Sequence, residues 1–121
     1  MVYSFVRIFA ASSFYEMPKI LKVKRILFGR NFLAITLGEL ILTTDRLDAC
    51  ELNHELIHVA QQRELLYLPF FIWYGIEWLV LFVRYRNALQ AYYNIRFEKE
   101  AYRHQDDLGY QKRRRHFRYD Q

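Results

Sequence analysis

The strongest constraint on the fold is a helix that the sequence predicts over residues 49–66. Asp48 precedes it and Glu51 follows three residues later, the spacing in which two side chains cap the first turn reciprocally. Pro69 then prevents continuation of this helix or opens a new one. The spacing of apolar residues gives this helix one apolar face, which is expected to pack on the core. That face consists of Leu56, Ile57, Val59 and Ala60.

The other face of the predicted helix carries His54 and His58 in the spacing H-E-x-x-H. Side chains four residues apart lie almost one above the other, so two imidazoles placed this way can bind one metal ion. Zinc is the ion that neutral imidazoles on a rigid helix suit best. Glu55 points about 100° away from His54, where it can take a proton from a metal-activated water. The alternative is a surface helix on which these three residues have no common role.

A catalytic zinc of this kind needs a third protein ligand and leaves one position for water. The candidates are Glu98, Glu100, His104, Glu77 and Cys50. Cys50 lies one turn before His54, too far along a straight helix for three ligands to reach one ion, because each four-residue step rises about 6 Å. Segment 97–102 is the favoured source, because it offers two carboxylates on a returning helix. The alternative is that both carboxylates only form ion pairs with neighbouring basic side chains.

These two motifs resemble those of the gluzincin metallopeptidases, in which His-Glu-x-x-His is followed some tens of residues later by Glu-x-x-Ala-(Asp). The segment Glu98-Lys99-Glu100-Ala101-Tyr102 is similar to the second motif. The membrane-bound CAAX prenyl endopeptidases and related heat-shock proteases show a similar pairing, and a small uncharacterised bacterial group has a similar FExEAY-like segment. The resemblance implies a zinc-dependent metallopeptidase, with Glu55 as general base and three zinc ligands: His54, His58 and Glu98.

The resemblance covers residues 35–105 and departs from the family pattern at one position. Tyr102 stands where the larger enzymes have an Asp that orients a ligating histidine, and a tyrosine hydroxyl supplies no buried negative charge. The chain has 121 residues, far fewer than most peptidases of this type. Any cleft must therefore be shallow, or be completed by a membrane or a partner. The alternative function is a non-catalytic zinc-binding or membrane-associated module.

Three β-rich runs precede the predicted helix, over residues 20–28, 32–37 and 40–44. Gly38-Glu39 fits a two-residue type II′ turn between the second and third runs. The expected fold is α+β, with a small three-stranded antiparallel meander followed by a helical bundle that carries the H-E-x-x-H helix. By analogy with gluzincin-like folds, strand 40–44 could pair with an extended peptide substrate.

The fourteen residues 70–83 are almost wholly apolar and are followed by Arg84 and Arg86. A bilayer span needs about 20 residues, so a buried or interfacial helix is favoured over a span of residues 65–83. Glu77 interrupts the run. It is interpreted as a neutral core carboxyl with a hydrogen-bond partner, or alternatively as a group close to the metal ligands.

A later helix is expected over residues 97–107, ended by Gly109. Before it lie Tyr92 and Arg96, and either could steady the oxyanion that forms during peptide hydrolysis. The sequence does not choose between these two side chains.

Length and composition predict one domain over residues 1–110, metallopeptidase-like by resemblance, and a basic, mobile tail over 111–121. Hydrophobic residues make up 53% of the chain, which excludes overall disorder, and a single cysteine excludes an internal disulfide framework. The tail could contact anionic lipid headgroups. The expected partners are a peptide or protein substrate and a membrane surface, without nucleic acid, because no reader motif accompanies the charge.

Residues 1–14 mix apolar side chains with Arg7. A strand or short helix is favoured there over a signal peptide, because the arginine falls where the apolar core of a signal peptide should be. The cellular location is left open between the cytoplasm and a membrane.

Overall fold

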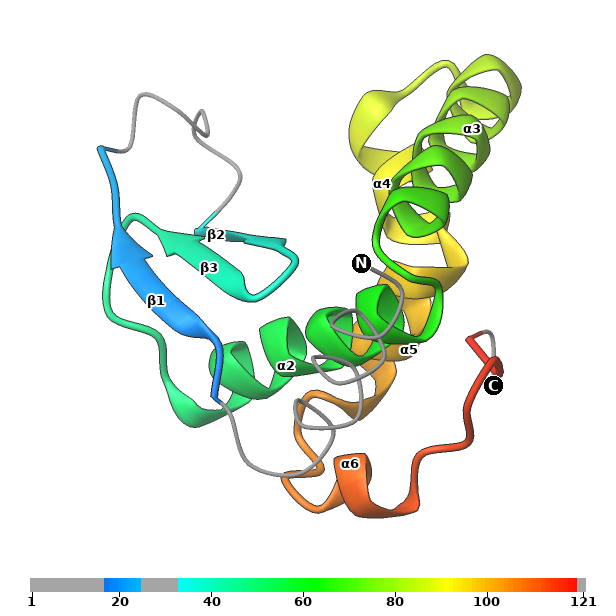
Figure 1. Ribbon diagram of the computed structural model, residues 1–121. Coiled ribbons are helices and arrows are strands. Elements are labelled where there is room, and N and C mark those ends of the chain that lie inside the picture. Colours follow the sequence, from blue (N-terminus) through cyan, green and yellow to red (C-terminus); the bar gives the residue numbers. More distant parts are fainter. Residues whose placement is uncertain (1–16, 25–32, 120–121) are drawn as a thin grey trace.

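The computed structural model describes residues 17–24 and 33–119, in which a small sheet is followed by helices (Figure 1). The strands are β1 (Lys19–Lys22), β2 (Ala34–Leu37) and β3 (Leu40–Thr43). The helices are α2 (Ala49–Glu64), α3 (Leu68–Tyr85), α4 (Ala88–Asn94), α5 (Arg96–His104) and α6 (Tyr110–Arg113). This arrangement confirms the α+β class. The predictions for residues 1–14 and for the end of the first strand and its turn, 25–31, lie outside the described residues.

The sheet has the strand order β1-β3-β2. β2 and β3 form the predicted antiparallel hairpin, with Leu37 opposite Leu40 and Gly38 at a positive φ of 62°. The predicted meander is wrong, because β1 pairs with β3 and runs parallel to it. β3 takes the middle position because its side chains suit burial: Ile41 is fully buried, whereas Ile20 in β1 is 49% exposed. Periodicity predicts that strands exist, and it carries no information on which strands become neighbours.

Helix α2 begins with the predicted reciprocal cap. The backbone N–H of Glu51 donates to Asp48 Oδ1 at 2.8 Å, and the backbone N–H of Asp48 donates to Glu51 Oε2 at 2.9 Å. The helix ends at Glu64, two residues before the predicted end. Its polar face is buried as well as its apolar face, because β2 and α5 lie along it. Among the described residues, every buried side-chain N or O atom has a hydrogen-bond partner, so the buried polar face is fully satisfied.

The turn from α2 into α3 is fixed to the β2–β3 hairpin. Leu66 and Tyr67 both have left-handed backbone conformations, with φ of 59° and 66°. The Tyr67 hydroxyl donates to Glu39 Oε1 at 2.7 Å, and Arg63 Nε donates to the same oxygen at 2.8 Å. Pro69 lies in the first turn of α3, as expected of a proline that opens a helix. The sheet is thereby held at a fixed position relative to both helices.

Aromatic side chains from α3, α5 and the C-terminal segment form the core, which consists of Phe70, Ile95, Phe97 and Tyr119. The predicted later helix is α5, which ends at His104, and Gly109 caps the start of α6 instead of ending a helix. Within the basic tail, the Arg114 guanidinium is buried and contacts Glu64 and Glu100. Arg114 and Tyr119 are therefore packed, and mobility of the other residues of the tail stays a prediction.

Helix α3 extends away from the sheet with α4 beside it (Figure 1). It has 18 residues with a mean hydropathy of 1.3, and only 6% of them are buried. The buried form of the favoured interpretation is therefore wrong, and the interfacial form stays a prediction. By length and composition alone it could cross a membrane. Glu77 Oε2 accepts from Arg96 Nε at 2.9 Å and from Trp73 Nε1 at 2.9 Å. The interpretation of Glu77 as a neutral carboxyl is replaced by an ion pair with a guanidinium.

Replacing Arg114 by alanine should lower the free energy of unfolding by about 3–5 kcal/mol, because it leaves two buried carboxylates without their cation. Arg113→Ala is the matched control, since that side chain is 64% exposed and pairs with Asp107 at the surface. The control should cost about 0–1 kcal/mol. Urea unfolding followed by circular dichroism measures both. Equal effects of the two substitutions would show that Arg114 does not anchor the C-terminal segment.

Candidate metal centre

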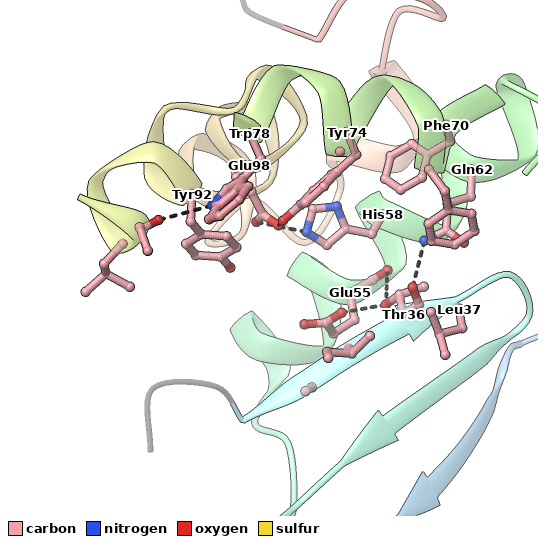
Figure 2. A pocket seen from close by; sticks show the side chains of 16 residues that line it. Thr36, Leu37, Glu55, His58, Gln62, Phe70, Tyr74, Trp78, Tyr92 and Glu98 are labelled. Atoms are coloured by element: carbon pink, nitrogen blue, oxygen red, sulfur yellow. Dashed lines mark hydrogen bonds and ion pairs between the residues drawn. The ribbon is translucent and has the colours of Figure 1, made fainter. Parts of the chain in front are cut away.

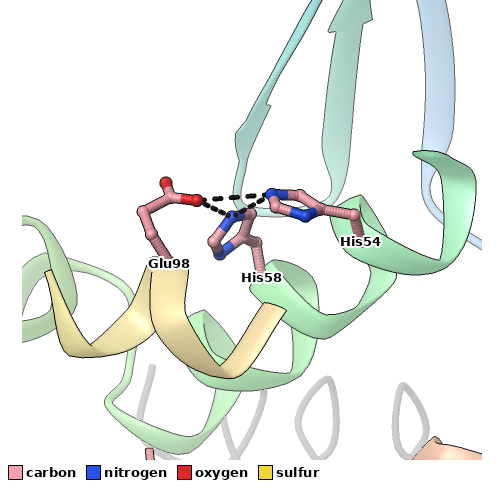
Figure 3. A group of neighbouring side chains, drawn as sticks. All are labelled: His54, His58 and Glu98. Atoms are coloured by element: carbon pink, nitrogen blue, oxygen red, sulfur yellow. Dashed lines mark hydrogen bonds and ion pairs between the residues drawn. The ribbon is translucent and has the colours of Figure 1, made fainter. Parts of the chain in front are cut away.

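Three side chains from two helices converge on one point, as Figure 3 shows. α2 supplies His54 and His58, and α5 supplies Glu98. The two Nε2 atoms are 3.1 Å apart, and Glu98 Oε2 lies 3.1 Å from His58 Nε2 and 3.3 Å from His54 Nε2. All three residues are at least 94% buried. In the described part of the chain, this is the only group of three such side chains that could hold a metal ion.

The triangle fits a tetrahedral ion. Zinc ligands at about 2.0–2.1 Å from the metal lie about 3.3–3.4 Å from one another in a tetrahedron. The three donor separations of 3.1–3.3 Å come close to that value without movement of the backbone. Two imidazole nitrogens and one carboxylate oxygen also leave a fourth position for a further ligand. The group can therefore bind a divalent metal ion.

Side-chain amides orient both imidazoles. His54 Nδ1 lies 3.0 Å from Gln105 Oε1, and His58 Nδ1 lies 2.8 Å from Gln61 Oε1. An amide oxygen only accepts, so each Nδ1 carries a proton, and Nε2 is the atom that can give a lone pair to a metal ion once it has lost its own proton. Such orienting contacts are general at metal sites. Gln105 performs the role for which Tyr102 was considered, while the Tyr102 ring packs edge-on against His54 with centroids 4.4 Å apart.

The orienting groups are themselves held by further contacts. Gln61 Nε2 donates to the Phe97 carbonyl at 3.0 Å and to Glu100 Oε1 at 2.7 Å. Arg114 Nη2 donates to the same Glu100 oxygen at 2.9 Å. On the other side, the Tyr74 hydroxyl donates to Glu98 Oε1 at 2.7 Å, which leaves Oε2 to face the imidazoles. Sequence reasoning missed these roles, because it considered Glu100 only as a ligand or as a partner of neighbouring basic side chains, and because Tyr74 and Arg114 lie far from every ligand in the sequence.

Burial and mutual attraction shift the pKa values of the ligands in opposite directions. Burial by itself would lower the pKa of His58, but the charge of Glu98 and its hydrogen bond outweigh burial and raise that pKa to about 9. Burial would raise the pKa of Glu98, but the charge of His58 and hydrogen bonds from both imidazoles lower it well below its usual range. Glu98 is therefore ionised at neutral pH and is ready to coordinate a cation.

The other candidate ligands have different partners. Glu100 is bound by Gln61, Tyr110 and Arg114, and Glu77 is bound by Arg96. The His104 ring stacks on Tyr110 with centroids 3.9 Å apart. Cys50 lies at the start of α2 and is not part of the converging group. The structure thus selects Glu98 from the alternatives that the sequence left open.

The converging group borders an apolar pocket of about 610 Å³ between β2, α2, α3 and α4 (Figure 2). Glu55, His58 and Glu98 supply its acidic and basic side chains, and most of the remaining lining is apolar or aromatic. Glu55 Oε2 accepts a hydrogen bond of 2.5 Å from the hydroxyl of Thr36 on β2. Tyr92 also lines the pocket, whereas Arg96 does not. Of the two side chains considered for the oxyanion, only the tyrosine reaches this space.

Strand β2, not β3, presents an edge to the pocket. β3 is paired on both sides, so the expectation that strand 40–44 could pair with a peptide is wrong. In an antiparallel hairpin, every second residue of a strand hydrogen-bonds to the partner strand, and the residues between turn their N–H and C=O groups the other way. Thr44 N donates to the Leu33 carbonyl, so Leu33 is bonded to β3. Ala34 and Thr36 therefore turn their backbone groups outward. The side chain of Gln62 occupies some of the hydrogen-bonding groups of this edge. Its Nε2 donates to the Thr36 carbonyl at 2.8 Å, and its Oε1 accepts from Gly38 N at 2.5 Å.

No protein-family model matches the chain, and neither a curated protein nor a solved structure matches it. The resemblance to gluzincins therefore depends on the two motifs and on the geometry that they adopt. The fold and the buried His-His-Glu group are the findings on which a function can be built.

Gln105→Ala should weaken zinc binding by about 10–100-fold, because His54 loses the contact that fixes its orientation. Gln111→Ala is the control, since Gln111 is exposed and makes no contact with the centre. Titration against a competing chelator gives the affinity, and circular dichroism checks that both variants fold. An unchanged affinity in Gln105→Ala would contradict the orienting role of the amide.

Zinc affinity should rise with pH between about 6.5 and 9. The folded chain raises the pKa of His58 from 6.5 to about 9, so His58 keeps its proton throughout this window. The metal must displace that proton, and binding therefore strengthens by up to about tenfold per pH unit until the imidazole is neutral. Chelator competition at several pH values measures the slope. A flat profile across the window would mean that no proton is released from this imidazole.

Proposed function

We propose that this chain is a zinc-dependent metallopeptidase that hydrolyses peptide bonds with an activated water. One observation carries the proposal: His58 and Glu98, two of the three converging side chains, line the same pocket as the Glu55 carboxylate, beside a strand edge. A structural zinc site would need four protein ligands and no adjoining pocket, whereas a catalytic site has three and leaves a position open. The H-E-x-x-H motif and the later Glu98 motif, which resemble those of gluzincins, support the same function.

The chain supplies a general base in Glu55. A zinc ion, when bound, would polarise the peptide carbonyl and lower the pKa of a water molecule. Glu55 accepts the proton of the attacking water and returns it to the leaving amine. The Thr36 hydroxyl holds Glu55 Oε2 at 2.5 Å and so fixes the carboxylate at the pocket wall. This contact ties the base to the strand edge along which a substrate would lie.

Tyr92 is the donor best placed to steady the oxyanion. Burial, followed by the nearby charge of Glu98, raises the pKa of its hydroxyl far above the usual range, so the group stays protonated. Its oxygen lies 3.0 Å from the Tyr102 hydroxyl, which orients it within the pocket. A neutral phenol donates a hydrogen bond to developing negative charge without carrying a competing charge of its own.

The substrate would be an extended peptide with apolar side chains. The outward backbone groups of Ala34 and Thr36 can pair with a peptide main chain in the manner of an added strand. Gln62 closes this edge at Thr36 and Gly38, which limits pairing to the part nearer Ala34. The pocket walls from α3 and α4 suit apolar side chains, because Phe71, Trp78 and Leu89 line them.

Replacing Glu55 by glutamine tests the proposal directly. The variant should bind zinc as the unchanged chain does and lose about 10²–10⁴-fold in hydrolysis of a fluorogenic peptide library, because an amide cannot take the proton. Glu51→Gln is the matched control, since glutamine also serves in a capping box and the residue lies away from the pocket. Normal zinc binding with no cleavage by the unchanged chain would instead leave a non-catalytic zinc-binding module.

A further inference from the structure

Helix α3 divides into an inward side and an apolar outward side. The inward side packs on the core through Phe70, Tyr74, Trp78 and Leu81. At about 100° per residue, the large exposed side chains spread over about 180° of the remaining circumference. We call this surface the outward arc, and its residues include Phe71, Ile72, Ile76, Leu79, Val80 and Val83. In the part of the chain that the structure describes, nothing covers these side chains.

We propose that the outward arc docks on the surface of a bilayer that contains anionic lipids. The apolar stripe that a surface helix turns to its protein core is about 100° wide or somewhat more. α3 already has such an inward stripe, and the outward arc is a second apolar surface that is wider. A lipid phase contacts the whole exposed circumference at once, because acyl chains adapt to any side-chain shape. The width of the arc therefore favours lipid over a partner helix or a second copy of the chain.

Charge is arranged as a bilayer surface requires. Glu77 is the only acidic residue of α3, and it turns inward to Arg96, so the arc itself carries no charge. Arg84 and Arg86 follow at the C-terminal end, both exposed, and the whole chain has a net charge of +5. Basic side chains beside an apolar helix face attract anionic headgroups near the surface.

The pocket opens beside the docked surface. Phe71 lies on the outward arc and also lines the pocket, as does Gly75 one turn later, where a Cβ would meet nothing within 4 Å. Docking through the arc would therefore hold the mouth of the pocket at the lipid interface. This placement follows from the helix alone and does not require that the centre be catalytic.

Sedimentation with vesicles tests the proposal on the full chain. Vesicles of phosphatidylcholine with phosphatidylglycerol should bind the unchanged chain more strongly than vesicles of phosphatidylcholine alone. The double variant Ile76→Glu, Val80→Glu should lose about tenfold or more in binding, because two charges enter the apolar contact. Leu108→Glu is the control: its side chain is 61% exposed but lies outside α3, so binding should not change.

A second readout separates lipid contact from other occupants. Trp73 is 37% exposed on α3, and its fluorescence in a Trp78→Phe background should shift to shorter wavelength when anionic vesicles are added. No vesicle binding by the unchanged chain, or equal binding by the double variant, would overturn the proposal. The proposal would also be overturned if the unchanged chain forms a dimer without lipid, the double variant does not, and neither protein binds vesicles. Because the assay needs no hydrolysis, its outcome is independent of the proposed enzymatic function.

Discussion

The carboxylate of Glu98, buried between two imidazoles, is the interaction on which the rest of the site depends. A buried charge without partners is strongly unfavourable, so every acceptor position of this group must be met by the fold. Oε2 faces His54 and His58, and Oε1 takes the hydroxyl of Tyr74. These donors come from α2 and α3, while Glu98 itself belongs to α5. Satisfying one carboxylate thus fixes three helices relative to one another.

The packing of the C-terminus is part of the same arrangement. Arg114 neutralises Glu100, Glu100 holds the amide of Gln61, and that amide orients the imidazole of His58. A segment that the charge pattern favoured as a mobile tail is therefore connected to the metal ligands through three contacts.

The sequence predicts the parts of the structure that local rules determine. The capped helix, predicted over residues 49–66 and observed over Ala49–Glu64, and the hairpin turn at Gly38 follow from capping and turn rules. Spacing brings the two histidines together, whereas the choice of Glu98 over Glu100 came only from the resemblance. The strand order does not follow, because β1 joins the sheet through contacts across the sequence. Gln105 could not be foreseen either, since its position depends on where α5 ends. The choice between a buried and an interfacial α3 could not be made from sequence either, because periodicity does not show what covers an apolar helix.

X-ray absorption at the zinc edge of the purified, zinc-loaded chain tests the central claim most directly. The account predicts one zinc ion per chain with two imidazole nitrogens and at least one oxygen at about 2.0–2.2 Å. It also predicts that Glu98→Ala removes the protein oxygen from this shell. A shell with one imidazole or none, or zinc bound with the same spectrum after Glu98→Ala, would contradict a centre built from His54, His58 and Glu98.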